Sequence, residues 1–398
     1  MKISKKQKGA KSGKGLLFAG KEAEAWLLIA PLLFLVVLLI WYPQIMSFFW
    51  SMCDMQGYAP TAFVGFKNYR NILSNTMFLK ILLNTLKYVL WSLAIGYIAP
   101  LLTALMLNET AHFKSGFKSL IYFPHVLPGV AVSLMWYLMY FPDEGGMINM
   151  LLSGFKSVKE IYQIPPEIFP KEIRLSKLYE VWKLLKLGKS YIASTVICIG
   201  EVAFGVIFPA LGGYVISRLR PKGSKLVMSL LLWTMMMPGS IRTVPLFMVF
   251  NDLPLIHVSL IGTYFPMWMY AGANIFTTLL FKNNFDAISI SLIEAARIDG
   301  CSDLKTFKNI LLPLSVPIIM VSVIRIVVSS WSGFLWPMLV IKDENYMPVT
   351  VKLYRMKTQY QLDQYMLALI FGMLPPAVMY FIFQRYILGG QNVGGVKE

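Results

Sequence analysis

The sequence predicts an all-α polytopic membrane protein with about eight transmembrane helices, and two observations carry that prediction. Of its 398 residues, 57% are hydrophobic and only 14% are charged, whereas about a quarter of the residues in a soluble domain are charged. The hydrophobic residues also occur in separate blocks of roughly 20 residues, the length that crosses the hydrocarbon of a bilayer. The mean hydropathy of +0.60 agrees, and this composition disfavours a soluble enzyme.

Eight blocks are apolar and long enough to be predicted as spans. Proline and glycine recur inside them, which a buried transmembrane bundle tolerates because neighbouring helices satisfy the freed backbone groups. The predicted spans are 25–48, 83–107, 118–141, 191–217, 226–250, 260–282, 309–335 and 365–387.

The net charge of +17 comes from 37 Lys and Arg against 20 Asp and Glu. In a membrane protein such an excess is typical of cytoplasmic loops, so we expect contact with a membrane and none with nucleic acid. Lysine is frequent in residues 1–24, which predicts a basic cytoplasmic tail. Eight spans then place both termini in the cytoplasm, and the other segments expected there are 108–117, 218–225, 283–308 and 388–398. The loop 142–190 is external in this scheme, although it is rich in lysine.

Residues for redox, metal or nucleotide chemistry are scarce. The three cysteines, Cys53, Cys198 and Cys301, lie far apart without a CxxC spacing, which indicates neither a disulfide framework nor a metal site. The three histidines form no metal-binding motif, and no phosphate-binding glycine loop is present. We therefore expect no cofactor, no metal and no enzymatic activity in this chain, and ATP chemistry only on a separate one.

Segments 83–141 and 193–250 resemble each other, because Pro128-Gly129 in the first aligns with Pro238-Gly239 in the second. Each segment reads as an apolar helix, a short basic loop and a second apolar helix. Internal repeats are common in transporters. The alternatives are a duplication and two hydrophobic hairpins that look alike by chance.

The predicted cytoplasmic loop 283–308 carries the most informative pattern. Ser291 and Glu294 have the spacing of a capping box, which starts a helix, and Gly300 stands where a helix end needs a positive φ. A second helix is expected from about Ser302 into the membrane. The sequence therefore predicts a short exposed helix at the mouth of the bundle. Such a helix either docks in a groove of a partner or lies on the lipid surface as an amphipathic connector.

The residues EAARIDG at 294–300 and the apolar positions that follow match the EAA motif of the permease subunits of ABC importers, with Cys301 in place of one alanine. This resemblance implies a coupling helix that sits in a cleft of the ATP-hydrolysing subunit. The residues that it implies for ATPase coupling are Glu294, Ala295, Ala296, Asp299, Gly300, Phe307 and Pro313. One departure from the family is Ser289, which stands where a proline is frequent; a serine is an alternative helix start.

The resemblance extends along the chain and divides it. Residues 165–398 resemble the second permease of carbohydrate ABC importers of the maltose type, on MPG at 237–239 and QRY at 384–386 among others, and residues 25–155 resemble the first permease, on GFKNY at 65–69. We therefore interpret the chain as a fused or rearranged permease with a type I ABC importer core and one coupling loop. The expected domains are a tail at 1–24, a three-span region at 25–155, an external linker at 156–190 and a five-span core at 191–398.

Two charged residues lie inside predicted spans, Glu201 in 191–217 and Arg325 in 309–335. A charge at that depth is costly, so it usually faces the bundle interior or a cavity and has a partner. The two groups either form an ion pair or line the sugar path separately. Trp331, in the same span as Arg325, either stacks on a sugar ring or belongs to an interfacial aromatic belt.

The resemblance implies a permease subunit of an ATP-driven carbohydrate importer in a bacterial cell membrane, with oligosaccharides as the expected substrates. Its implied partners are ATP-binding subunits, a second permease subunit and an extracytoplasmic sugar-binding protein. Two alternatives stay open. One is a secondary transporter driven by an ion gradient, which leaves the motif at 294–300 unexplained, and the other is a rearranged fusion permease without transport activity.

Overall fold

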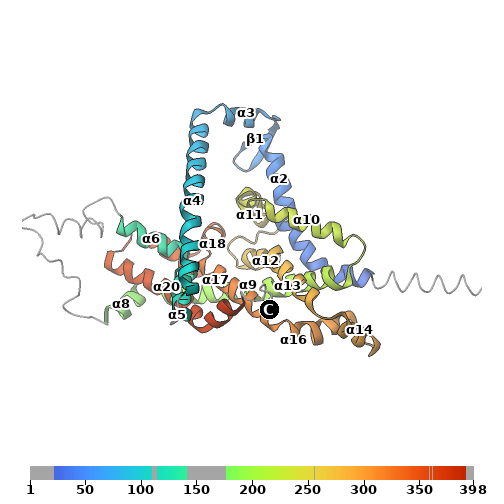
Figure 1. Cartoon of the computed structure of the whole chain (residues 1–398). Helices are drawn as coiled ribbons and strands as arrows, with labels where there is room; N and C mark the ends of the chain where they lie inside the picture. The colour runs from blue at the N-terminus through green and yellow to red at the C-terminus, as the bar shows by residue number, and fades with distance from the viewer. Residues whose placement is uncertain are drawn as a thin grey trace, which may run out of the picture. The chain divides into compact units, whose positions relative to one another are not determined.

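The computed structural model describes residues 22–109, 114–140, 176–254, 256–357, 359–360 and 362–390 (Figure 1). It confirms an all-α protein, to which the described part adds a two-stranded sheet. Most of the predicted basic tail, the greater part of the predicted loop 142–190 and the end of 388–398 lie outside the described residues.

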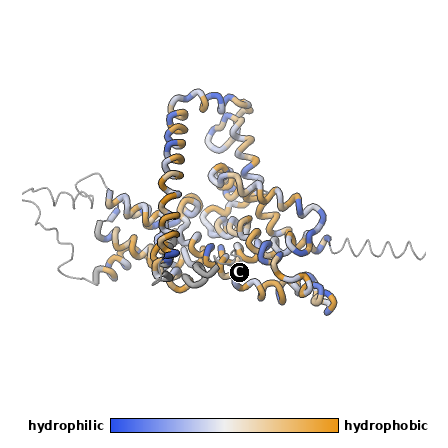
Figure 2. The backbone as a smooth tube through the Cα atoms, viewed as in Figure 1, coloured by the Kyte–Doolittle hydropathy of each residue, from blue (hydrophilic) through white to orange (hydrophobic). Residues whose placement is uncertain are grey.

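Four helices among the described residues are long and apolar enough to cross a membrane, and they correspond to the predicted spans 25–48, 83–107, 191–217 and 365–387. Figure 2 shows hydrophobic residues along much of their length. The four are Glu22–Ser51, which includes the π-helix η1 (Val37–Trp41) and α2 (Tyr42–Ser51); α4 (Thr76–Glu109); Leu187–Leu219, which includes α9 (Leu187–Tyr214) and η2 (Val215–Leu219); and Gln364–Phe383, within α20 (Leu362–Gly390).

The predicted spans 226–250 and 309–335 are bent. The helix α10 (Ser224–Met236) meets Gly239–Asn251, which is made of η3 (Gly239–Arg242) and α11 (Thr243–Asn251), at 95°. This bend falls at Pro238, which has no N–H to donate and whose ψ of 128° is extended. The second bend, of 78°, separates Asp303–Leu314 from α17 (Val316–Ser332). The first of these segments is made of α15 (Asp303–Thr306), η4 (Phe307–Leu311) and α16 (Leu312–Leu314).

The predicted spans 118–141 and 260–282 are each divided into two shorter helices. The helices α5 (Lys114–Val126) and α6 (Gly129–Met139) are separated at Pro128, and α12 (Phe265–Gly272) and α13 (Ile275–Ala287) are separated at Asn274. The Asn274 side chain caps α13 by accepting a hydrogen bond of 2.9 Å from the Thr277 N–H. The described residues thus contain four continuous spans, or up to six if each bent pair is one span, and the predicted number of eight is not confirmed.

The two Pro-Gly pairs of the predicted repeat have the same local structure. Pro128 has φ −57° and ψ 119° and directly precedes α6, and Pro238 has φ −58° and ψ 128° and directly precedes η3. In both places a helix ends two residues before the proline. This shared break favours a duplication over a chance likeness.

A small antiparallel hairpin follows the first span. Strand β1 (Cys53–Gln56) pairs with β2 (Ala59–Phe63), and α3 (Lys67–Leu73) comes next. The Asn68 amide donates hydrogen bonds of 3.1 and 2.9 Å to the carbonyls of Ser51 and Cys53. These bonds hold α3 against the hairpin.

The chain forms two compact units. Unit 1 comprises Met1–Tyr122, Phe204–Leu260 and Met269–Ile319, and unit 2 comprises Phe123–Ala203, Ile261–Trp268 and Met320–Glu398. Each unit combines segments from both sides of the predicted linker 156–190. The division into two permease types is therefore a division of the sequence, and it stays a prediction.

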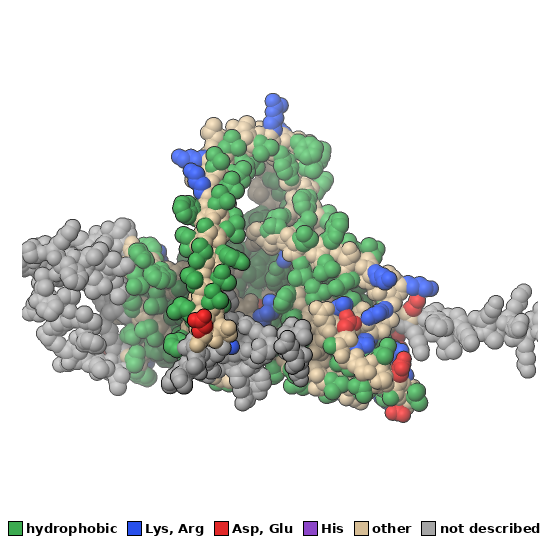
Figure 3. All heavy atoms as spheres, in the orientation of Figure 1, with side chains coloured by type: hydrophobic (Ala, Val, Ile, Leu, Met, Phe, Trp, Pro, Cys, Tyr) green, Lys and Arg blue, Asp and Glu red, His purple; other side chains and the backbone are tan. Residues whose placement is uncertain are grey.

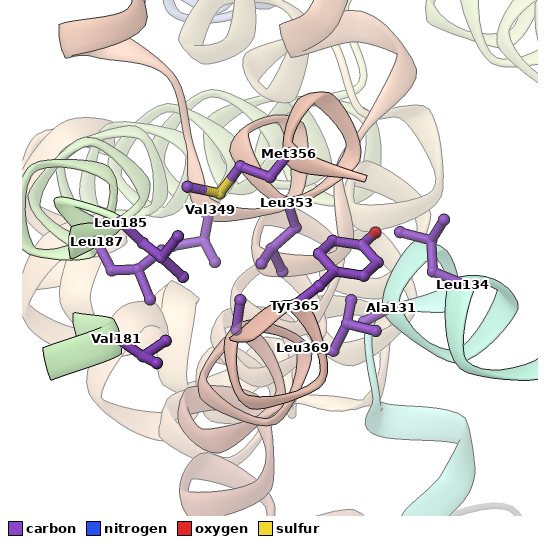
Figure 4. Close-up of a cluster of buried hydrophobic side chains, with 11 residues drawn as sticks. Ala131, Leu134, Val181, Leu185, Leu187, Val349, Leu353, Met356, Tyr365 and Leu369 are labelled. Carbon is purple, nitrogen blue, oxygen red and sulfur yellow. The ribbon is translucent and has the colours of Figure 1, made fainter. Parts of the chain in front are cut away.

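The hydrophobic core of unit 2 gathers around α19 (Val349–Met356) and α20, with contributions from α6 and α8 (Ser176–Leu184). Figure 4 shows Tyr365 of α20 next to Leu353 of α19, with Ala131 and Leu134 of α6 beside them. A second cluster in this unit packs around α18 (Leu335–Val340), and a short 3-10 turn, η5 (Glu344–Tyr346), follows it.

Candidate functional site

The short exposed helix that the sequence predicts is α14 (Ile290–Ile298), in unit 1. Its N-cap is Ser289, whose hydroxyl accepts a hydrogen bond of 3.3 Å from the Ser291 N–H. The predicted capping box at Ser291 is therefore wrong, because the extended backbone of Ser289, with ψ 134°, starts the helix two residues earlier. Glu294 lies in mid-helix as a result. Ser289, which the sequence offered only as an alternative start, is the helix start.

Gly300 ends this helix as predicted. Its φ of +76° lies in the left-handed region, which glycine adopts without steric strain. The Gly300 N–H donates to the Arg297 carbonyl at 3.2 Å and the Cys301 N–H donates to the Ala296 carbonyl at 2.9 Å, which are the two bonds of a Schellman motif. Open space surrounds the place where a Cβ would lie. The left-handed backbone conformation at position 300, and not steric crowding around a Cβ, therefore favours glycine there.

The chain then turns back through α15, which starts close to the predicted position. Ser302 is its N-cap and accepts a hydrogen bond of 3.4 Å from the Lys305 N–H. An ion pair of 3.4 Å between Arg297 and Asp303 crosses the turn at Gly300. The Asp303 carbonyl also accepts a hydrogen bond of 3.1 Å from the Tyr214 hydroxyl. The turn is thus tied both to α14 and to the end of α9.

The residues assigned to ATPase coupling divide into an inward and an outward group. Ala296 and Phe307 are buried in unit 1, so they shape the loop rather than offer a surface. The exposed members are Glu294, Ala295, Asp299, Gly300 and Pro313. Only the outward group is placed where a partner can touch it.

Ile298 was not assigned from the sequence, yet it is 86% exposed. It lies seven residues after Ser291, and residues at i, i+3, i+4 and i+7 share one face of a helix. Ser291, Glu294, Ala295 and Ile298 are all exposed, and we call them the docking face of α14. Burial of Ile293 and Ala296 marks the opposite side, and this spacing was the sequence signal that could have found Ile298.

An aromatic cluster lies beneath α14 in unit 1. The ring of Tyr214 lies 5.3 Å from that of Phe307 and 6.4 Å from that of Phe285, and Phe285 and Phe307 are 6.2 Å apart. Ile293 of α14 belongs to the same buried cluster. Through this cluster α14 packs against the end of α9, α13 and η4.

Arg218 fastens the end of the long helix Leu187–Leu219 to α13. Its guanidinium donates hydrogen bonds to the carbonyls of Phe285 and Ile288. Carbonyls at a helix C-terminus lack partners inside the helix and carry partial negative charge, so an arginine is a suitable cap. Because α14 begins two residues after Ile288, this contact fixes the point from which α14 projects.

Asp286 is the centre of a charged cluster beside that contact. It accepts a hydrogen bond of 2.6 Å from Ser217 and forms ion pairs of 2.7 Å with Lys282 and 3.4 Å with Arg220. Partial burial acts to raise the pKa of the Asp286 carboxyl, but the hydrogen bonds from Lys282 and Ser217 and the charges of Lys282 and Arg220 lower it overall. Figure 3 shows acidic and basic side chains gathered on the part of unit 1 that holds α14 and the start of α10.

The three residues assigned to a substrate path all belong to unit 2. Glu201 on α9 is partly buried, and Arg325 on α17 is exposed. Whether Glu201 and Arg325 form an ion pair or line the path separately stays a prediction. Trp331 packs edge-on against Tyr191 at 5.8 Å, and its buried indole N–H has no hydrogen-bond partner among the described residues.

The chain is similar to known transport proteins. Residues 205–389 match the model of a family described as "Binding-protein-dependent transport system inner membrane component". The chain is 27% identical over 256 residues to the arabinooligosaccharides transport system permease protein AraQ of Halalkalibacterium halodurans, covering 63% of this chain and 90% of that protein. It is 28% identical over 232 residues to the melibiose/raffinose/stachyose import permease protein MelC of Bacillus subtilis, covering 58% and 83%. A solved chain of a bacterial ABC transporter involved in the import of the acidic polysaccharide alginate is similar with a TM-score of 0.49 and 23% identity, covering 59% of this chain and 85% of that one.

Proposed function

We propose that this chain, whose residues 205–389 match the family of inner membrane components of binding-protein-dependent transport systems, is the permease subunit of an ATP-driven importer of oligosaccharides. The family is one of transport components and not of enzymes, so ATP hydrolysis is assigned to a separate subunit. The relatives that carry arabinooligosaccharides and melibiose, raffinose and stachyose in their names support oligosaccharides as the substrate class.

The docking face of α14 is the single observation that carries the proposal. A nine-residue helix presents Glu294, Ala295 and Ile298 outward while Ile293 anchors it from below. Small and apolar residues on one side of a short helix suit insertion into a groove of a partner. We assign that groove to the ATP-binding subunit, with Asp299, Gly300 and Pro313 at its rim and with Ala296 and Phe307 holding the loop in shape.

Coupling then follows from how α14 is attached. Closure of the ATP-binding subunits moves α14 as a rigid body, because Arg218 and the aromatic cluster bind it to the ends of α9 and α13. The movement shifts the spans between outward-open and inward-open arrangements that differ in affinity for the substrate, as every such cycle requires. Glu201, Arg325 and Trp331 are assigned to the substrate path of unit 2.

The assembly contains more than this chain. A second permease subunit, the same or different, completes the path, and an extracytoplasmic sugar-binding protein delivers the oligosaccharide to the outer loops. The chain crosses a bacterial cell membrane several times, with both termini and the loop 283–308 in the cytoplasm.

Uptake in inside-out and right-side-out vesicles tests the proposal. Transport of a labelled oligosaccharide must require ATP and the ATP-binding subunit, and it must survive an ionophore that collapses ion gradients. Uptake that the ionophore abolishes and that persists without the ATP-binding subunit would establish the ion-gradient transporter instead. Co-purification with the ATP-binding subunit but no uptake would establish the rearranged, non-transporting permease.

A further inference from the structure

We infer that a cavity in unit 1 binds the carboxylate of an acidic sugar, with Arg242 as the anion-binding residue. The inference rests on the proposed function and deepens it by naming a substrate class, oligosaccharides that contain uronate units. Neutral sugars carry no charge for the partly buried Arg242 to recognise. The site lies apart from Glu201, Arg325 and Trp331, none of which lines this cavity.

The cavity has a volume of about 190 Å³ and lies where two helices are interrupted. One side is the break between α10 and η3 at Met237, and the other is the break between α12 and α13 at Asn274. In secondary transporters, substrate sites are often formed by such discontinuous helices. A volume below the roughly 300–1,000 Å³ of a whole small-molecule site suits one sugar ring of a longer chain.

Arg242 brings a positive charge to this cavity without a matching carboxylate. Its guanidinium donates one hydrogen bond of 3.0 Å to the Tyr270 hydroxyl. Its Nε atom is buried and has no hydrogen-bond partner, and no ion pair in the described part of the chain includes it. An arginine that is partly withdrawn from water is stabilised by a bound anion, and we assign that anion to the ligand.

The rest of the lining suits a carboxylate on a sugar ring. The N-terminus of α13 opens on the cavity through Ile275 and Phe276, and the positive end of a helix dipole favours a negative group. The Tyr270 phenol offers a polar contact, and Phe276 offers an apolar surface. Arginine binds a carboxylate through two parallel hydrogen bonds, which fixes its orientation.

Calorimetric binding of trigalacturonate to the full chain in phosphatidylcholine nanodiscs tests the inference. The matched ligand is the fully methyl-esterified trisaccharide, which has the same rings without charge. Arg242→Gln is expected to weaken binding of the charged ligand by tenfold or more, since hydrogen bonds to charged groups are among the strong ones, and to leave binding of the ester unchanged. Arg242→Lys should recover part of the loss. The control Arg355→Gln alters an exposed arginine of α19 and should change neither affinity.

Equal affinities of native chain and Arg242→Gln for trigalacturonate overturn the inference, as does the absence of binding to the native chain. Nanodiscs that contain phosphatidylglycerol test the alternative that Arg242 binds an anionic lipid headgroup. If this lipid stabilises the native chain but not Arg242→Gln, and trigalacturonate does not bind, the site binds a lipid headgroup. Failure here leaves the proposed function intact when the chain still associates with the ATP-binding subunit. Binding of the uronate without that association would contradict the proposed function alone.

Discussion

The Arg297 guanidinium and the Asp303 carboxylate form an ion pair of 3.4 Å that bridges the turn at Gly300. Arg297 is half exposed and Asp303 is 13% exposed, so the pair lies at the edge of the unit 1 core. It joins the last turn of α14 to the first residue of α15. The pair therefore holds the docking face at a fixed angle to the segment that leads into α17.

Asp303→Asn should weaken the affinity of the chain for the ATP-binding subunit by up to about fivefold. Half-exposed ion pairs are worth about 0.2–1 kcal/mol, and the effect should shrink in high salt because screening weakens the native pair. Surface plasmon resonance of the reconstituted chain at two ionic strengths measures the loss of affinity and its dependence on salt. Arg297→Gln is the matched variant, and the double variant should be no weaker than either single one. A fully additive double variant would show that the two residues act separately.

Gly300→Ala should destabilise the loop by about 1–2 kcal/mol, because a non-glycine residue at φ +76° is strained. Gly300→Asp should do the same and also reduce ATPase association and uptake. Gly129→Ala is the control, since open space surrounds that glycine too and its φ is ordinary. Thermal unfolding in detergent and ATP-dependent uptake are the measurements. Gly300→Asp with both association and uptake intact would show that the coupling assignment is wrong.

The stability of the folded chain should depend on pH through the ionisation of Asp286. Its pKa in the folded chain lies below the ordinary value of 3.8, so the carboxylate contributes stability that is fully present above 3.8 and is lost as the pH falls through the folded pKa. The native chain should therefore unfold at a higher temperature than Asp286→Asn at neutral pH, and the difference should vanish in acid below 3.8. Thermal melts of both chains across this range provide the check. A difference that persists unchanged in strong acid would assign the effect to packing.

Part of this arrangement could be predicted from the sequence, because it depends on residues that are neighbours in the chain. Gly300 and Ser302 were predicted because a helix end and a helix start depend on a few neighbouring residues. The start of α14 was misplaced by two residues, since Ser289 and Ser291 are both good caps and only the extended backbone at Ser289 decides between them. The spans 226–250 and 309–335 were predicted as continuous because hydropathy does not report a bend at Pro238 or Ser315.

Contacts between segments that are distant in the chain could not be predicted from the sequence. Nothing in the sequence near Arg218 indicates that it caps α13, because its two carbonyl partners are separated from it by a whole bent helix pair. The cavity of Arg242 was missed for the same reason, since Tyr270 and Asn274 join it only in the folded unit. The sequence pattern indicated Glu201 and Arg325 instead, because they are charged residues within long apolar blocks.

The central claim is that the docking face of α14 binds the ATP-binding subunit, and the affinity of that subunit for Ile298→Asp tests it most directly. Ile298 is 86% exposed, so the substitution leaves the core of unit 1 unchanged. The control Ile72→Asp alters a half-exposed isoleucine of α3, on the side predicted to be external. We predict a loss of tenfold or more for Ile298→Asp, none for Ile72→Asp, and equal melting temperatures for both. Native affinity in Ile298→Asp would contradict the account.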